Sequence, residues 1–232
     1  MNQSIEICIS TMNHEFPDWI KSSFPYPILV INQCDEDSVI NLSDNVKVIN
    51  TTSIGLSRSR NIAFSEASAK YLYICDNDNS FSKSSLIELS RELEIDNPDV
   101  AICSSNLDEF SIMKKKKLNI RDIFSIASWQ ICVRKEIAQR IGFNERFGLG
   151  SNKISHGEEN IFLANALKSG LTIIGYPIKV INHPDLGTGY NHNPKFYTEK
   201  YFIYKEMVGI FFAIILIVRK FIIRQWKGAY RE

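Results

Sequence analysis

The chain has 232 residues, a length that suits one sizeable α/β domain. Of these residues 44% are hydrophobic and 23% are charged, which is typical of a folded globular protein. The 27 Lys and Arg residues against 26 Asp and Glu residues give a net charge of +1, which argues against nucleic acid as the principal partner.

Five short runs rich in Ile and Val predict strands that are buried on both faces of a parallel sheet. They are residues 5–10, 28–32, 46–50, 71–75 and 100–104. Helical patterns lie between them, short at 18–23 and clearer at 56–68 and 84–94. Strands and helices in alternation predict an α/β domain with a mostly parallel central sheet.

Polar side chains follow three of these predicted strands. Thr11, Asp35 and the pair Asp76 and Asp78 come just after strand ends, where ligands of such sheets bind. Because alternate side chains of an extended segment share a face, we expect Asp76 and Asp78 to point to the same place. Two carboxylates so close favour a hard divalent ion such as Mg²⁺ or Mn²⁺. The alternative is an ordinary turn, since Asp and Asn are favoured turn formers.

Two arginines lie near the start of the predicted helix that follows the Gly55 turn. Arg58 and Arg60 would suit a phosphate there, because the exposed N–H groups and the dipole of a helix start favour anions. Taken alone, arginines on a solvated first turn are the commoner case. Combined with Asp76 and Asp78, they predict a site for a nucleoside diphosphate and its metal ion.

Five motifs resemble those of the nucleotide-sugar-dependent glycosyltransferases of family 2. They are GLSRSRN at 55–61, ICDND at 74–78, IGFNERFGLG at 141–150, GEENIFLANALKSG at 157–170 and IKVINHP at 178–184. The resemblance covers roughly residues 5–190. It implies a single GT-A (Rossmann-like) domain at 1–195, with a nucleotide-sugar-binding half at 1–105 and an acceptor-binding half at 106–195.

The resemblance also assigns roles to individual residues. The expected metal ligands, for Mn²⁺ or Mg²⁺, are Asp76, Asp78 and His183. The expected nucleotide-sugar contacts are Thr11, Asp35, Arg58, Arg60, Asn61 and Asp76. The acidic pair Glu158–Glu159 matches the position of the general base, whose usual place is the second residue. Acidic residues also favour the first turn of any helix, which is the plain alternative for this pair.

The chain departs from the family pattern at three places. The Asp-Asp-Gly-Ser run that often follows the second strand is replaced by QCDEDS at 33–38, so the preferred base stays open. The position of the general base holds Glu159 where Asp is usual, so Glu158 remains a candidate. The Gln-x-x-Arg-Trp signature of processive synthases is absent, which favours the transfer of a single sugar.

Residues 196–232 predict a helical tail. Its apolar run, 207–218, would span about 18 Å as a helix, short of the roughly 30 Å core of a bilayer. Beyond it, a basic face lies opposite an apolar face that includes Ile222, Trp226 and Tyr230. The basic residues are Lys220, Arg224, Lys227 and Arg231. This pattern favours a helix on an anionic membrane surface, with a helix capping the domain core as the alternative.

The scattered cysteines and the unremarkable first residues predict a reduced, cytoplasmic protein without disulfides or a signal peptide. We therefore expect a metal-dependent, inverting glycosyltransferase, peripheral on the inner face of the membrane, that acts in polysaccharide biosynthesis. Its expected acceptor is a hydroxyl group of a glycan or lipid-linked oligosaccharide. The alternatives are a nucleotidyltransferase-like enzyme, whose Gly-rich phosphate loop is not visible, and a non-catalytic nucleotide-sugar-binding protein.

Overall fold

The computed structural model describes residues 4–21, 24–107, 111–182 and 195–229, and side chains up to residue 222 within the last range. The chain divides into two units, Met1–Leu186 and Gly187–Glu232. The first unit holds the sheet and the second holds the C-terminal helices, and each is described by itself.

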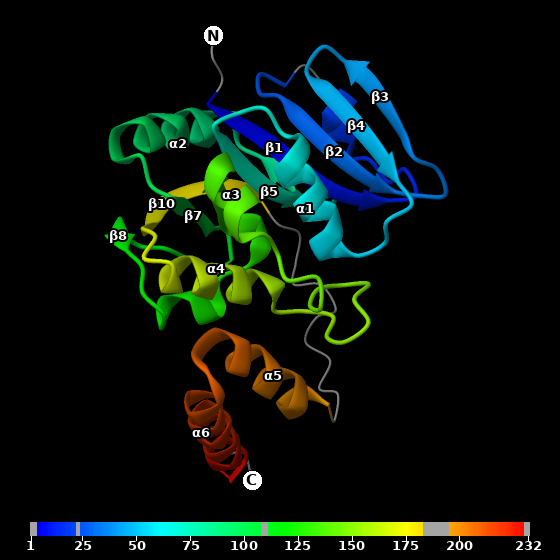
Figure 1. The fold of residues 1–232 in the computed structure, drawn as a ribbon. Helices are drawn as coiled ribbons and strands as arrows, with labels where there is room; N and C mark the ends of the chain where they lie inside the picture. The colour runs from blue at the N-terminus through cyan, green and yellow to red at the C-terminus, as the bar shows by residue number, and fades with distance from the viewer. Residues whose placement is uncertain (1–3, 22–23, 108–110, 183–194, 230–232) are drawn as a thin grey trace. The chain divides into compact units, whose positions relative to one another are not determined.

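A ten-stranded mixed sheet forms the centre of the first unit (Figure 1). The strand order is β3-β4-β2-β1-β5-β9-β7-β10-β6, and β8 pairs with β10. The strands are β1 (Ile5–Met12), β2 (Ile28–Gln33), β3 (Ser38–Ser43), β4 (Val46–Thr51), β5 (Tyr71–Asp76), β6 (Ser80–Phe81), β7 (Val100–Ser105), β8 (Lys116–Lys117), β9 (Ile131–Arg134) and β10 (Ile173–Asn182). The core pairs β4–β2, β2–β1, β1–β5 and β7–β10 are parallel. The predicted α/β fold with a largely parallel sheet is confirmed.

The five predicted strands correspond to β1, β2, β4, β5 and β7. Their Ile- and Val-rich runs are buried, as strands covered on both faces require. The other five strands, β3, β6, β8, β9 and β10, are not among those predicted. β3 is an exposed edge strand, and β9 is a four-residue strand that inserts antiparallel between β5 and β7.

Helices cover both faces of the sheet. They are α1 (Leu56–Glu66), α2 (Lys83–Asp96), α3 (Lys135–Ile141) and α4 (Glu158–Lys168), with short 3-10 turns at η1 (Asp18–Lys21), η3 (Asp122–Ser125) and η4 (Ser128–Gln130). On one face, Ser59 of α1 donates to Ser10 of β1 (Oγ to Oγ, 2.9 Å). On the other face, Leu86 of α2 shares a core with Ile9, whose side chain points away from that of Ser10.

Aromatic packing joins α1 to α3 and α4, which come later in the first unit. The Phe143 ring, just after α3, lies 5.5 Å from the Phe64 ring of α1 and 4.8 Å from the Phe162 ring of α4, measured between centroids. These contacts place α1, α3 and α4 on the same side of the sheet, as Figure 1 shows. The two halves of the sequence therefore share one core around α1.

The second unit is a pair of helices, α5 (Phe196–Val208) and α6 (Ile210–Ala229), joined at Gly209 with a φ of +83°. The ring of Tyr197 lies 5.9 Å from that of Phe221, and Lys220 Nζ lies 4.9 Å from the centroid of Phe196. Lys220 thus packs on α5 and is not simply part of a solvated basic face.

The described part of α6 is apolar on most of its circumference, and its large side chains are exposed, for example Phe211 at 71%. The other members of the predicted basic and apolar faces, Arg224, Lys227, Arg231, Trp226 and Tyr230, lie outside the described side chains. Among the helices of the described residues, none is both long enough and apolar enough to cross a membrane.

Candidate active site

Asp76 ends β5 at the carboxyl edge of the sheet, and the chain turns immediately after it. The amide of Asn79 donates to the carbonyl oxygen of Asp76 at 3.4 Å, which closes a turn through Asn77 and Asp78. The expectation that Asp76 and Asp78 share one face of an extended segment is therefore wrong, because the strand has already ended and Asp and Asn favour turns. Asp76 is partly exposed and Asp78 is exposed.

The acidic turn is fastened to the loop that follows β1. Trp19 Nε1 donates to the carbonyl oxygen of Asn79 at 2.7 Å. Asn77 Nδ2 donates to the carbonyl oxygen of Glu15 at 3.1 Å. The two strand ends, of β1 and β5, are therefore linked by hydrogen bonds on the side where ligands bind such sheets.

A buried guanidinium, that of Arg60 on α1, lies at the centre of the site and is 2% exposed. Its Nη1 donates to Glu158 Oε1 at 2.7 Å, and its Nη2 donates to Asp76 Oδ1 at 3.1 Å and to Ser128 Oγ at 2.8 Å. Burial alone would lower the pKa of Arg60, but the negative charges of Asp76, Glu158 and Glu159 outweigh burial and raise this pKa. The group therefore stays charged, and it is enclosed by protein carboxylates.

The two glutamates that begin α4 lie in different surroundings. Glu158 is buried, at 4% exposure, and its Oε1 is bound to Arg60. Its Oε2 is also buried and has no hydrogen-bond partner among the described residues. Glu159 is only half-buried. Of the pair, Glu159 is thus the more accessible carboxylate.

The loop before α4 packs closely behind Glu158. Gly148 has a φ of +99°, and a methyl group on it would lie 2.9 Å from Ser57 Oγ and 3.3 Å from Glu158 Cδ. Ser57 Oγ in turn donates to the carbonyl oxygen of Phe147 at 2.7 Å. A side chain at this position would be strained, because the φ angle is unfavourable for it and Ser57 or Glu158 would have to shift.

Two residues predicted as nucleotide contacts hold α1 to the same loop. Arg58 is exposed and pairs with Glu145 (Nε to Oε2, 3.2 Å). Asn61 binds the backbone of Phe143 through both ends of its amide, at 3.0 Å to the carbonyl oxygen and 2.7 Å from the N–H group. The structure therefore does not bring Arg58 and Asn61 together with Asp76.

Asp35 follows β2, as predicted, whereas Thr11 lies inside β1, which continues to Met12. Thr11 is buried, and its Oγ1 donates to the carbonyl oxygen of Glu15 at 2.7 Å, while Asp35 is exposed. Sequence reasoning missed two buried asparagines beside them, Asn32 and Asn50, which occupy matched positions on β2 and β4. The repeated Val-Ile-Asn at the ends of these two strands is the signal that could have found them.

The carboxylates at the end of β5 fit a divalent ion that is shared with a substrate. The described residues contain no group of three His, Cys, Asp or Glu side chains that could hold a metal, and the predicted ligand His183 lies outside them. Asp76 and the exposed Asp78 still provide oxygen ligands. Mg²⁺ typically uses one or two carboxylates and completes its shell with substrate phosphates and water. The donor set fits such an ion and does not fit a metal cage made of protein alone.

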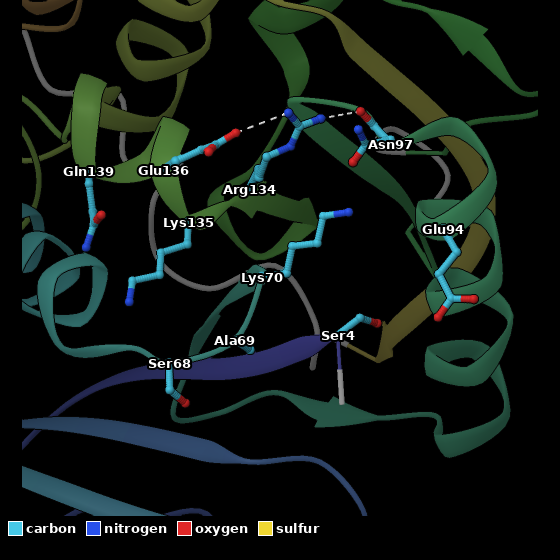
Figure 2. A pocket seen from close by; sticks show the side chains of 10 residues that line it. All are labelled: Ser4, Ser68, Ala69, Lys70, Glu94, Asn97, Arg134, Lys135, Glu136 and Gln139. Atoms are coloured by element: carbon cyan, nitrogen blue, oxygen red, sulfur yellow. Dashed lines mark hydrogen bonds and ion pairs between the residues drawn. The ribbon is translucent and has the colours of Figure 1, made fainter. Parts of the chain in front are cut away.

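A cavity of about 780 Å³ lies at the other end of the strands (Figure 2). It is bordered by Ser4 and Lys70, which precede β1 and β5, and by Arg134, which pairs with Glu136 at 3.2 Å. Since β5 runs away from this cavity to Asp76, roughly 17 Å further along, the cavity does not belong to the site.

The family model for glycosyl transferase family 2 matches residues 26–157, which is more than half of the chain. The chain belongs to this family. No curated protein matches it.

Solved structures of TarS from S. aureus are similar to the chain. TarS 1-349 superposes with a TM-score of 0.61 at 18% identity, covering 88% of this chain and 65% of that one. The complex of TarS 1-349 with UDP-GlcNAc gives a TM-score of 0.63 at 16% identity, covering 88% and 66%. For TarS itself the TM-score is 0.63 at 16% identity, with coverage of 86% and 39%. At these identities the likeness shows the fold, and the chain spans less than two thirds of TarS 1-349.

Proposed function

We propose that the chain transfers one sugar from a UDP-sugar to a hydroxyl group of a glycan acceptor, with inversion at the anomeric carbon. Membership of family 2 and the similarity to TarS, a complex of which holds UDP-GlcNAc, support a UDP-sugar donor. The observation that carries the proposal is the buried Arg60, which binds Asp76 at the donor strand end and Glu158 at the start of α4. Residues 1–105 would hold the donor and residues 106–195 the acceptor.

Asp76 and Asp78 would hold the divalent ion, Mn²⁺ or Mg²⁺, beside the diphosphate. When bound, such an ion supplies a Lewis acid that stabilises the charge developing on the departing UDP. The hydrogen bond from Arg60 Nη2 keeps the Asp76 carboxylate in place. Thr11 and Asp35, at the ends of β1 and β2, would contact the nucleoside.

Glu159 is the proposed general base. It takes the proton of the acceptor hydroxyl group as that oxygen forms a bond to the anomeric carbon and the bond from this carbon to UDP breaks. Glu158 is less suited to the task, because its Oε1 is bound to Arg60 and its side chain is buried. We therefore assign Glu158 to positioning α4.

The tail, residues 196–232, is proposed to bind an anionic membrane surface, where a lipid-linked oligosaccharide would serve as the acceptor. The exposed apolar side chains of α6, the adjacent Arg219 and Lys220, and the lack of any acidic residue in Ile210–Ala229 support this partner. The free cysteines of the described residues suit the reducing, cytoplasmic side.

Co-flotation with vesicles tests the tail. The chain should float with vesicles of phosphatidylcholine and phosphatidylglycerol and less with phosphatidylcholine alone. The variant Phe211→Asp/Ile215→Asp should remain in the soluble fraction. Equal recovery of the variant and the unchanged chain with anionic vesicles would contradict the membrane proposal.

Thermal unfolding with UDP, GDP and dTDP, with and without Mn²⁺, tests the donor site. A nucleotide at 100 times its Kd stabilises the folded state by about 2.7 kcal/mol, which for this chain length raises Tm by roughly 5–10 °C. We expect this shift for UDP with Mn²⁺ only, and we expect Asp78→Ala to abolish it. Asp44→Ala, in the exposed turn between β3 and β4, is the control and should keep the shift. The absence of any shift with the three nucleotides would reject the proposed function.

A further inference from the structure

The turn that follows β1 contains two consecutive non-glycine residues in the left-handed region, Asn13 at a φ of +50° and His14 at +63°. This conformation is unfavourable for residues that have a Cβ atom, so surrounding contacts have to hold it. They are visible: the amide of Asn13 donates to the carbonyl oxygen of Gln33 at 3.0 Å, and the amide of His14 donates to Asn32 Oδ1 at 2.9 Å. The loop is thereby fixed to the end of β2, with the His14 side chain exposed.

The orientation of the Asn32 amide follows from its partners. Its oxygen accepts from the His14 amide, so its nitrogen faces Asn50 Oδ1 at 2.8 Å and His14 Nδ1 at 3.1 Å. Asn50 agrees with this arrangement, because its own nitrogen donates to Ser38 Oγ at 2.8 Å and to Glu36 Oε1 at 3.2 Å. The Asn32 side chain is fully buried, so its amide oxygen and nitrogen have to keep these hydrogen bonds.

The network determines which nitrogen of His14 carries the proton. An amide nitrogen can only donate, so His14 Nδ1 has to accept from Asn32 Nδ2. A neutral imidazole with an accepting Nδ1 carries its proton on Nε2. The hydrogen bond from Asn32 therefore leaves His14 with an N–H donor at Nε2.

The donor lies where a nucleoside would have to lie if its diphosphate is held at the end of β5. β1 is between β5 and β2 in the sheet. The loop that carries His14 is bound on one side to the acidic turn, through Asn77 and the carbonyl oxygen of Glu15, and on the other side to Asn32. A nucleoside that extends from Asp76 and Asp78 toward β2 would therefore lie next to this loop.

We propose that His14 selects the nucleobase of the donor by donating from Nε2–H to the 4-carbonyl oxygen of uracil. Cytosine presents an amino group at that position, so the same donor would face another donor and the cytosine nucleotide would bind more weakly. The inference rests on the proposed function, because it assigns base recognition within the same donor site. It makes His14 a specificity-determining residue, held in its tautomer by Asn32.

Calorimetric binding of UDP and CDP in the presence of Mn²⁺ tests the proposal. The unchanged chain should bind UDP at least about tenfold more tightly than CDP, which is the discrimination that one hydrogen bond provides. His14→Asn tolerates the left-handed backbone but is too short to reach the base, so it should weaken UDP about tenfold and leave CDP unchanged. His14→Gln restores a longer N–H donor and should recover most of the preference.

The outcomes separate this inference from the function on which it rests. Metal-dependent binding of UDP and CDP with equal affinity, or a preference that His14→Asn does not change, would overturn the role of His14 and leave the donor site intact. Failure of the unchanged chain to bind either nucleotide would reject both. Nitrogen NMR of the histidine rings provides a readout without ligand: we expect a protonated Nε2 and an unprotonated Nδ1 for His14, and the opposite tautomer would refute the proposal.

Discussion

Asp76 and Glu158 are held by the same guanidinium, since Arg60 donates to Asp76 Oδ1 at 3.1 Å and to Glu158 Oε1 at 2.7 Å. Asp76 ends a strand of the proposed donor half, and Glu158 begins the helix that also carries Glu159. The position of the proposed base relative to the proposed metal site therefore depends on one buried side chain. This relationship makes Arg60 a positioning residue.

Replacement of Arg60 should destabilise the fold strongly. Arg60→Met leaves the buried Glu158 carboxylate without its cation, and breaking a buried pair from one side costs about 3–5 kcal/mol. Urea unfolding should report this loss in the midpoint at an unchanged slope. The control is Arg58→Met, which breaks the exposed pair with Glu145 and should cost less than about 1 kcal/mol. Similar losses for both variants would contradict the central role of Arg60.

The two glutamates of α4 should respond differently to the same change. Glu159→Gln should lower Tm less than Glu158→Gln, leave the Kd of UDP unchanged and lower kcat by about 10²–10⁴-fold, the contribution of a general base. Glu158→Gln should lower the free energy of unfolding, because Arg60 loses a charged partner in a buried site. Assays of UDP release and urea unfolding on both variants check this division. Full turnover by Glu159→Gln would assign the base elsewhere.

Gly148 and Gly170 form a matched pair of positions. Both have positive φ angles, +99° and +74°, but a methyl group at Gly148 meets Ser57 Oγ at 2.9 Å whereas one at Gly170 meets nothing within 4 Å. Gly170→Ala should cost about 1 kcal/mol from backbone strain alone. Gly148→Ala should cost about 1–3 kcal/mol more, since it also forces Ser57 or Glu158 to move. Equal losses of unfolding free energy in the two variants would mean that Ser57 and Glu158 move aside without strain.

The cysteines should differ sharply in their reaction with a thiol reagent. Burial raises the pKa of Cys103 to about 12 and the pKa values of Cys8, Cys75 and Cys132 well above the ordinary value. These four thiols should stay unreactive at pH 8, because the thiolate is the reactive form. Cys34 is partly exposed at the end of β2, so one thiol per folded chain should react rapidly, and Cys34→Ser should remove this phase. Rapid reaction of several thiols would contradict this prediction, because it would mean that the buried strands are accessible to the reagent.

The parallel core of the sheet was predictable because its strands are continuous apolar runs. β9 was not, since four residues, Ile131–Arg134, have too little periodicity to distinguish a strand from the start of a helix. The apolar run of residues 71–75 located Asp76 at the end of a strand, but the turn after Asp76 and the burial of Arg60 depend on partners far along the chain. The pairing of Asn32 with His14 likewise arises from packing that no local pattern encodes.

Arg60 and Glu158 are 98 residues apart in the sequence, and this distance has a consequence for biosynthesis. At about 5–20 residues per second, a ribosome completes Glu158 roughly 5–20 s after Arg60. During this interval the strands of the N-terminal half can form, but Arg60 lacks its acceptor-side partner and cannot be buried at its final position. A nascent chain that ends before α4 should therefore stay sensitive to proteases, and native resistance should arise in one late step of translation.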